Sequence, residues 1–218
     1  MTTTEFNTEL DIIYENINKN GAPGLDAYEK SVILTHAEEL FVKESIKAGG
    51  EEMFPNLIAN YSTSSVLAGS YGLNSYEFPI ASSYIKILNE YLMDATSEVV
   101  TLIPISSAEF QMKKSKPYAY PQRRTAWRLG LDNTSAKISA FVRDGYIPTI
   151  YRSRYIRKPL PIILANLATL TPAASIDGLT AITECELDAN HHRDILKIAA
   201  TLAEQYYMDK YNTGSNES

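Results

Sequence analysis

Cysteine, tryptophan and histidine are scarce in this sequence of 218 residues, which has one Cys, one Trp and three His. Because a disulfide needs two cysteines, the lone Cys185 excludes a bridge within the chain, and a reducing compartment is the simplest expectation. No uncharged apolar run approaches the roughly 18 residues of a membrane-spanning helix. Residues 1–5 lack the basic start and apolar block of a signal peptide. We therefore expect an intracellular chain, or part of an assembly made inside a cell, with no membrane partner.

The short motifs of common enzymes are absent as well. The sequence contains no G-x-S-x-G, no phosphate-binding P-loop, no dinucleotide-binding glycine pattern and no H-E-x-x-H. The adjacent His191 and His192 would point about 100° apart on a helix, and one cysteine is too few for a zinc site with several Cys ligands. A Cys185–His191 nucleophile pair would rest on residue type alone. We expect no catalytic residues, no metal and no cofactor.

Charge is distributed unevenly along the chain. The 46 residues from Lys113 to Lys158 hold twelve Lys or Arg and two acidic residues, a net charge of +10, while the remainder carries −16. Most of the twelve are Arg, which suits carboxylate and phosphate at buried interfaces better than Lys. The segment fits a solvated surface, a contact with nucleic acid or docking on an acidic partner. Because the same chain supplies the acidic surface, copies could pair head to tail in a ring.

Apolar periodicity predicts helices at both ends of the chain. Spacings of three and four between apolar residues predict a helix over 5–18, and Asp26 with Glu29 forms a capping-box pattern that begins a second helix. The short Gly/Pro loop between them predicts an antiparallel helix pair. A last helix is expected over 188–210.

The middle of the chain changes to the period of two that is typical of β-strands. Strands are expected over 84–92, 98–105, 127–129, 137–143 and 146–155. The dipeptide Asp144-Gly145 predicts a hairpin turn between the last two of these strands. A run of strands between helical segments indicates an α+β fold.

The predicted architecture is an antiparallel N-terminal helix pair and a C-terminal helix packed with a strand-rich, antiparallel β middle segment. We expect one domain over residues 1–211, helical over 1–60 and 188–210 and strand-rich over 83–165. The polar tail 212–218 should stay disordered unless a partner orders it.

Several blocks of sequence resemble virion structural proteins of crAss-like and related Bacteroidetes phages. In chain order they are PGLDAYEKSVILTHAEE (23–39), IPIS (103–106) with KPY (116–118) and WRL (127–129), YIRKPLPI (155–162), and TECEL (183–187) leading through His192 to Ile195-Leu196. The combination is more specific than any one block. The layout of elements is also similar, by analogy only, to adaptor ring proteins below the portal of short-tailed phages.

The resemblance implies a non-enzymatic ring subunit of the head-to-tail connector. It implies a dodecamer that matches the portal, extends the DNA channel during ejection and docks the tail. The implied partners are further copies, the portal protein, adjacent connector or tail ring proteins, and genomic DNA contacted without sequence specificity. The implied location is the head–tail junction of the virion, after assembly in the host cytoplasm.

Two sets of residues are candidates for contacts of such a ring. Candidates for channel lining or subunit pairing are Arg123, Arg124, Arg143, Arg152, Arg154, Arg157 and Lys158. Candidate interface aromatics are Tyr118, Tyr120, Trp127, Tyr151 and Tyr155. The alternative function is a basic-patch DNA-binding module that acts as a monomer or dimer, in which the aromatic and Arg side chains of residues 151–155 stack on nucleic acid.

Overall fold

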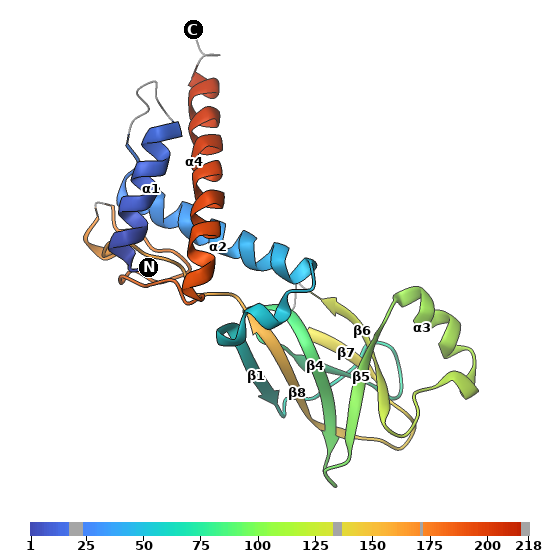
Figure 1. Cartoon of the computed structure of the whole chain (residues 1–218). Coiled ribbons are helices and arrows are strands. Elements are labelled where there is room, and N and C mark those ends of the chain that lie inside the picture. The colour runs from blue at the N-terminus through green and yellow to red at the C-terminus, as the bar shows by residue number, and fades with distance from the viewer. Residues whose placement is uncertain (18–23, 133–136, 171, 215–218) are drawn as a thin grey trace. The chain divides into compact units, whose positions relative to one another are not determined.

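The computed structural model describes every residue except 18–23, 133–136, 171 and 215–218 (Figure 1). The described residues form helices and a β-sheet, so the predicted α+β class is confirmed. The α-helices are α1 (Thr3–Ile17), α2 (Ala27–Lys47), α3 (Ser107–Lys114) and α4 (His192–Gly214). The strands are β1 (Ile58–Thr63), β2 (Leu67–Ala68), β3 (Ser75–Pro79), β4 (Tyr84–Asp94), β5 (Val99–Ile105), β6 (Thr125–Asp132), β7 (Lys137–Phe141) and β8 (Pro148–Arg157).

Contacts divide the chain into two compact units. The helical unit combines residues 1–57 with 158–218, and the β unit consists of residues 58–157. The β unit is therefore an insertion between the two halves of the helical unit. The single domain expected over 1–211 stays a prediction.

The N-terminus of α2 is built as its sequence predicts. The side chain of Asp26 accepts a hydrogen bond from the backbone N–H of Glu29 at 2.7 Å, and the Glu29 carboxylate accepts one from the N–H of Asp26 at 3.1 Å. This capping box satisfies two N–H groups that a helix start leaves without partners. Gly49, at a φ of +85°, follows the end of the helix in the left-handed conformation that glycine adopts easily.

The C-terminal helix α4 packs against both α1 and α2. The ring of Phe6 on α1 lies 5.0 Å from that of His192 at the start of α4. Lys30 on α2 reaches Asp11 on α1 in an ion pair of 2.7 Å, which joins the two N-terminal helices directly. In Figure 1, α2 crosses α4, whereas α1 runs beside it.

The end of the chain differs from its prediction. Helix α4 continues to Gly214, so residues 212–214, expected to be disordered, extend the last helix. No Pro interrupts the backbone hydrogen bonds of this stretch, and the helix ends at a glycine, the residue that most often follows a helix. Residues 215–218 of the predicted tail lie outside the described residues.

After β8 the chain returns to the helical unit as an extended segment held by α2. The N–H of Ile162 donates to Thr35 Oγ1 at 3.1 Å, and the N–H of Leu164 donates to Ser31 Oγ at 3.0 Å. Ser31 and Thr35 are buried, and buried polar groups need hydrogen-bond partners. These hydroxyls thus anchor the extended segment to one face of α2.

The β unit is a curled sheet with the strand order β1-β8-β4-β5-β6-β7-β3-β2. Neighbouring strands are antiparallel except β5 and β6, which run parallel from Thr101↔Thr125 to Ile105↔Leu129. The rings of Phe78 on β3 and Tyr151 on β8 stack at 5.6 Å although these strands are far apart in the order. The sheet therefore curls around its core, which includes Phe78, Leu92, Val100, Leu102, Ala126, Ile138, Ala140 and Tyr151.

Helix α3 lies within the connection between the parallel strands. Ser106 caps it by accepting from the N–H of Glu109 at 3.1 Å. Phe110 of α3 is buried in a second aromatic cluster with Trp127, Leu129 and Phe141. The strand β6 thus contributes to the curled core through Ala126 and to this cluster through Trp127 and Leu129.

The predicted hairpin at Asp144-Gly145 is wrong. The turn exists, with Gly145 at a φ of +74°, but β7 pairs with β6 and β3, while β8 pairs with β1 and β4. Both edges of β7 are occupied, so β8 cannot fold back on it. Local turn chemistry specifies a reversal of the chain and leaves the pairing partner open.

Candidate anion-binding surface on the sheet

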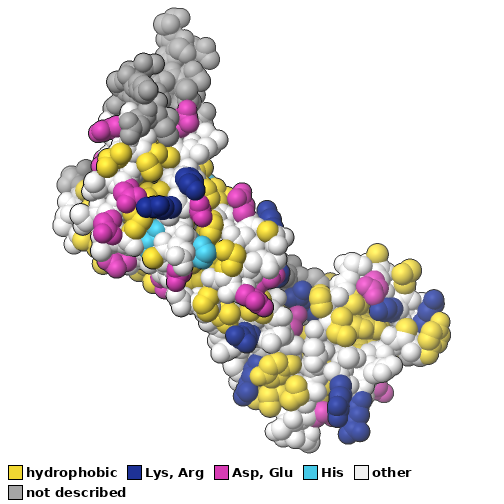
Figure 2. Space-filling view, in the orientation of Figure 1, with side chains coloured by type: hydrophobic (Ala, Val, Ile, Leu, Met, Phe, Trp, Pro, Cys, Tyr) yellow, Lys and Arg dark blue, Asp and Glu magenta, His cyan; other side chains and the backbone are white. Residues whose placement is uncertain are grey.

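The two units carry charge of opposite sign. Residues 58–157 contain twelve basic and seven acidic side chains, a net charge of +5, and the helical unit carries the remaining −11. Figure 2 shows blue Lys and Arg side chains over the β unit. All the predicted basic candidates except Lys158 belong to this unit.

Several basic side chains are already paired within the chain. Arg143 contacts Glu98 at 2.9 Å and lies 5.7 Å from the centre of the Tyr146 ring. Arg123 lies 3.5 Å from the same Glu98 carboxylate, although its side chain is largely exposed. Arg157 ends β8 opposite Tyr84 and is half-buried. The contacts of Arg143 and Arg123 with Glu98 lie where β5 begins, whereas Arg157 lies beside the first residue of β4.

Lys158 belongs to the helical unit and bridges two of its acidic residues. Its ammonium lies 2.7 Å from Glu39 on α2 and 2.6 Å from Asp177. Burial opposes the charged form, but the two carboxylates outweigh it and raise the pKa of Lys158. Its contacts therefore give Lys158 a structural role within one chain.

Arg128 forms an internal ion pair that sequence reasoning missed. It lies 3.0 Å from the buried Glu90, whose carboxylate also accepts a hydrogen bond from the Tyr151 hydroxyl at 3.1 Å. Burial raises the pKa of Glu90, and Arg128 and Tyr151 act in the opposite direction. The available signal was the alternation of β6, which places Arg128 on the same face as Ala126, away from Trp127.

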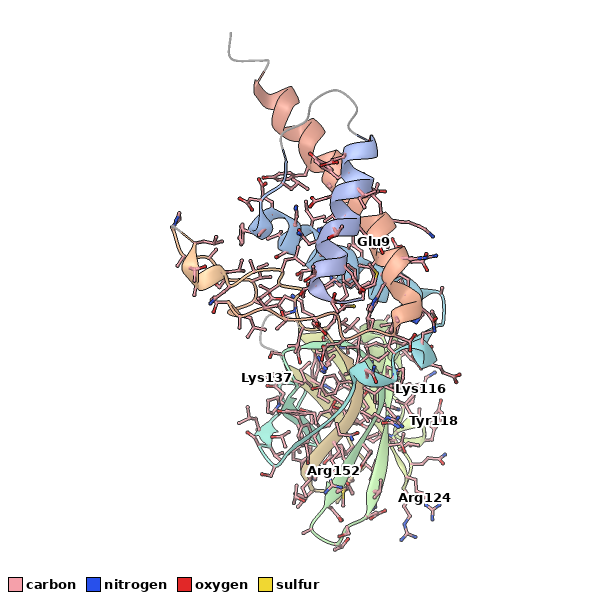
Figure 3. All side chains as sticks on the ribbon, turned by 60° about the vertical axis from the view of Figure 1, so that its left-hand side comes forward. Glu9, Lys116, Tyr118, Arg124, Lys137 and Arg152 are labelled. Atoms are coloured by element: carbon pink, nitrogen blue, oxygen red, sulfur yellow. The ribbon has the colours of Figure 1, made fainter. Side chains whose placement is uncertain are left out.

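Two arginines stand apart from these pairs. Arg152 and Arg154 are exposed on β8 and alternate with the buried Tyr151, Ser153 and Tyr155. Within the described residues, neither guanidinium has an ion pair or a hydrogen bond to a side chain. Figure 3 labels Arg152 on this strand. Both guanidinium groups are therefore available to a partner.

The neighbouring strands add uncharged polar groups around the two arginines. Ser62 and Tyr91 are the register partners of Arg152, and Asn60 and Asn89 are those of Arg154. An open hollow of about 510 Å³ is lined by Asn60, Tyr61, Ser62, Asn89, Tyr91, Arg152, Ser153 and Arg154. This lining contains no carboxylate. Guanidinium groups beside amides and hydroxyls form a donor-rich surface that suits carboxylate or phosphate.

Arg124 is a further exposed basic side chain. It lies beside Arg123 next to β5, where these residues line a shallow hollow with Glu98 and Val99. Its side chain extends outward from the sheet (Figure 3). The nearby Glu98 carboxylate makes this surface less favourable for an anion than the surface around Arg152.

The predicted interface aromatics are mostly core residues. Trp127, Tyr151 and Tyr155 are buried within the chain itself. Tyr120 packs against the ring of Phe141 at 5.6 Å, and its hydroxyl donates to a backbone carbonyl. Tyr118 is 84% exposed. Packing within the chain accounts for the three buried rings, and the interface role stays a prediction, which the exposed Tyr118 and the partly buried Tyr120 fit best.

The groups considered for chemistry are placed in structural roles. The Cys185 thiol donates to buried Glu38 at 3.1 Å, and burial together with this carboxylate raises the pKa of the thiol. A thiol held protonated is a poor nucleophile, and His191 packs against the rings of Phe41 and Phe54. In the described ranges, no group of three His, Cys, Asp or Glu is placed to hold a metal ion.

No helix among the described residues is long and apolar enough to cross a membrane.

Comparison with known proteins gives consistent results over nearly the whole chain. Ring protein 4/5 of Bacteroides phage crAss001 is 30% identical to this chain, over 95% of this chain and 94% of that protein. Ring protein 3 of the same phage is 28% identical, over 93% of this chain and 95% of that protein. A family described as phage tail ring protein 3/4 matches residues 1–216. The resemblance to crAss-like phage structural proteins is thus confirmed, and the chain belongs to the phage tail ring protein 3/4 family.

Proposed function

We propose that this chain is a non-enzymatic subunit of a homo-oligomeric ring in the head-to-tail connector of a phage virion. The ring, a dodecamer in this proposal, stacks with the portal or with adjacent ring proteins, extends the DNA channel and docks the tail. The observation that carries the proposal is the match of residues 1–216 to the tail ring family. The relatives named as ring proteins are matched over nearly their full length.

The division of charge supports assembly from identical copies. A basic β unit and an acidic helical unit occur in every subunit, so the basic surface of one copy finds a complementary surface on the next. Such a contact joins two different patches, and it closes into a ring when the rotation between copies permits. Complementary charge also guides the orientation of approach.

The experiment that tests this proposal is mass photometry of the purified chain, alone and mixed with assembled portal. We expect a discrete species whose added mass corresponds to one ring of subunits per portal. A chain that stays monomeric and ignores the portal would contradict the adaptor position. The experiment should then be repeated with the adjacent ring proteins of the phage in place of the portal. Only a chain that also fails to assemble with them would contradict the proposed ring.

The exposed arginines also give the DNA-binding alternative a direct test. A free DNA-binding module should bind duplex DNA as a monomer or dimer, with an affinity that falls steeply with salt. An isolated ring subunit should bind duplex weakly, because contact with DNA in a channel requires the assembled ring. Fluorescence anisotropy with labelled duplex at two salt concentrations separates these outcomes.

A further inference from the structure

We propose that the surface around Arg152 and Arg154 is the docking site for the exposed acidic face of α1 in a neighbouring copy. This inference depends on the proposed ring, because it assigns the two sides of one subunit contact. It goes further by naming the residues on each side of the contact. The proposed interaction is an ion pair between carboxylate and guanidinium groups.

The basic side of the contact is complete within the β unit. Both guanidinium groups lack partners among the described residues, and Asn60, Ser62, Asn89 and Tyr91 surround them with further polar groups. The strand β1 ends the sheet on this side, and its residues Ile58–Thr63 include no charged side chain and no proline. Edge strands that avoid partners usually carry such residues, so the sequence of β1 does not oppose contact with a neighbouring chain.

The acidic side is a helix with one buried and one exposed face. Phe6, Leu10 and Tyr14 bury α1 in the helical unit, whereas Glu5 and Glu9 are exposed. Asp11 is occupied by Lys30, but no basic side chain among the described residues pairs with Glu5 or Glu9. One oxygen of Glu5 accepts from the N–H of Thr2, which leaves the other oxygen available. Figure 3 labels Glu9 on α1.

The spacing of the charges is similar on the two sides. Glu5 and Glu9 are four residues apart on a helix, a rise of about 6 Å along its axis. Arg152 and Arg154 are two residues apart on a strand, a rise of about 6.6 Å. A helix laid along β8 can therefore place each carboxylate opposite one guanidinium, in the charge-assisted geometry that favours Arg.

A nucleic acid backbone is the competing occupant, because phosphates also bind guanidinium groups. The surface supplies only two unpaired guanidinium groups, and Ser62, Tyr91 and the two Asn side chains add no charge. A single copy thus falls short of the roughly 6–10 phosphate contacts of tight duplex binding, although a closed ring of copies would supply more. The acidic helix, by contrast, is present once in every subunit and therefore matches the arginine pair one to one. The observations favour a second copy of this chain.

Charge reversal tests the contact in assembled rings. Arg152→Glu with Arg154→Glu, and separately Glu5→Arg with Glu9→Arg, should each weaken recruitment into portal-bound rings by about tenfold or more, because like charges then face each other. Combining all four substitutions should restore ring formation. Lys114→Glu with Lys116→Glu is the matched control: both side chains are exposed in the β unit, and the change in charge is equal. Thermal unfolding confirms that each variant is folded.

Cross-linking identifies the partner surface directly. In a Cys185→Ser background, Glu9→Cys with Arg152→Cys should give a covalent ladder of dimers and higher species from oxidised rings on a denaturing gel. Glu9→Cys with Lys116→Cys should give little ladder. A product that stays at monomer mass would show that Glu9 of one copy does not face Arg152 of the next, and it would overturn the inference.

The outcomes separate this inference from the proposed function. If the unmodified chain forms no ring with portal or ring proteins, the proposed function fails. If it forms rings and the Arg152/Arg154 variant forms them equally well, only the docking site is wrong. If that variant assembles normally but its rings lose affinity for duplex DNA, the surface belongs to the DNA channel and the inference is overturned.

Discussion

Arginine has opposite roles on neighbouring parts of one sheet. Arg128 pairs with the buried Glu90 at 3.0 Å, whereas Arg152 is exposed on β8. Their difference follows from the strand face on which each lies, because successive side chains of a strand point to opposite faces. A count of basic residues along the sequence therefore overstates the surface that is available to a partner.

We expect a single substitution in the pair of Glu90 and Arg128 to lower the free energy of unfolding strongly. Glu90→Ala leaves a mostly buried guanidinium without its counter-ion and the Tyr151 hydroxyl without its acceptor. Removing one partner of a buried pair costs about 3–5 kcal/mol, and the partial exposure of Arg128 places our expectation at about 3 kcal/mol. Urea unfolding followed by the fluorescence of Trp127, which lies in the β unit, measures the loss.

The matched control for this substitution is Glu109→Ala. Glu109 pairs with Lys113 on the surface of α3, where an exposed pair contributes about 0.5 kcal/mol or less. Equal losses in the two variants would show that the Glu90 network does not stabilise the core.

We expect the contribution of Lys158 to the free energy of unfolding to depend on pH. Burial opposes ionisation of Glu39, but Lys158 and Lys43 outweigh it and hold the pKa of Glu39 below its usual value. A carboxyl with a lowered pKa in the folded state adds stability above its unfolded pKa of about 4.3, and this stability is lost as the pH falls through the folded value. Lys158→Met should therefore cost about 1 kcal/mol or less at pH 7, and the deficit should shrink below about pH 4.

Circular dichroism during urea unfolding at pH 7 and pH 3.5 checks this difference. Lys47→Met, an exposed substitution at the end of α2, should show the same small deficit at both pH values. A Lys158→Met deficit that is equally large at pH 3.5 would mean that lost packing, not the ion pair, is responsible.

At the scale of elements, the start of α2 gives the sharpest prediction. Asp26→Ala removes the side-chain acceptor of the capping box and should lower the free energy of unfolding by about 1 kcal/mol. Asp26→Asn keeps an acceptor oxygen and should lose much less. Urea unfolding followed by circular dichroism measures both variants, and equal losses would show that the charge of Asp26 matters more than its hydrogen bond.

Local signals in the sequence predicted individual elements well. The capping residue Asp26 and the period of two over β4 and β5 depend on neighbours within a few residues, so a single sequence contains the information. Strand pairing depends on partners far along the chain. The turn at Asp144-Gly145 and the parallel pairing of β5 with β6 show the consequence, because nothing local specifies which strand occupies a free edge.

The sequence predicts one part of the candidate site, the alternation of side chains along β8, and leaves another part open. The alternation of residues 151–155 places the tyrosines on one face of β8 and Arg152 and Arg154 on the other, and this much follows from the sequence. Alternation does not determine which face is buried. The structure turns Tyr151 and Tyr155 into the core, which converts expected interface aromatics into packing residues and leaves the arginines exposed.

At the scale of the whole molecule, the β unit begins and ends at neighbouring points. Ile58 on β1 pairs with Ile156 on β8, so the chain enters and leaves this unit side by side. Its curled core and its second aromatic cluster consist of residues from 58–157 alone. A segment whose ends meet and whose core is its own satisfies the requirements for folding independently.

We therefore predict that residues 58–157, expressed alone, fold. The excised unit should show one cooperative urea transition by Trp127 fluorescence, and at pH 7 its net charge of +5 should make it migrate on a native gel opposite to the full chain, whose net charge is −6. Residues 1–57 joined to 158–218 by a short Gly/Ser linker should keep their helical circular dichroism. Aggregation or the absence of a cooperative transition in the excised β unit would show that its core needs the helical unit, in agreement with the single domain that the sequence predicts.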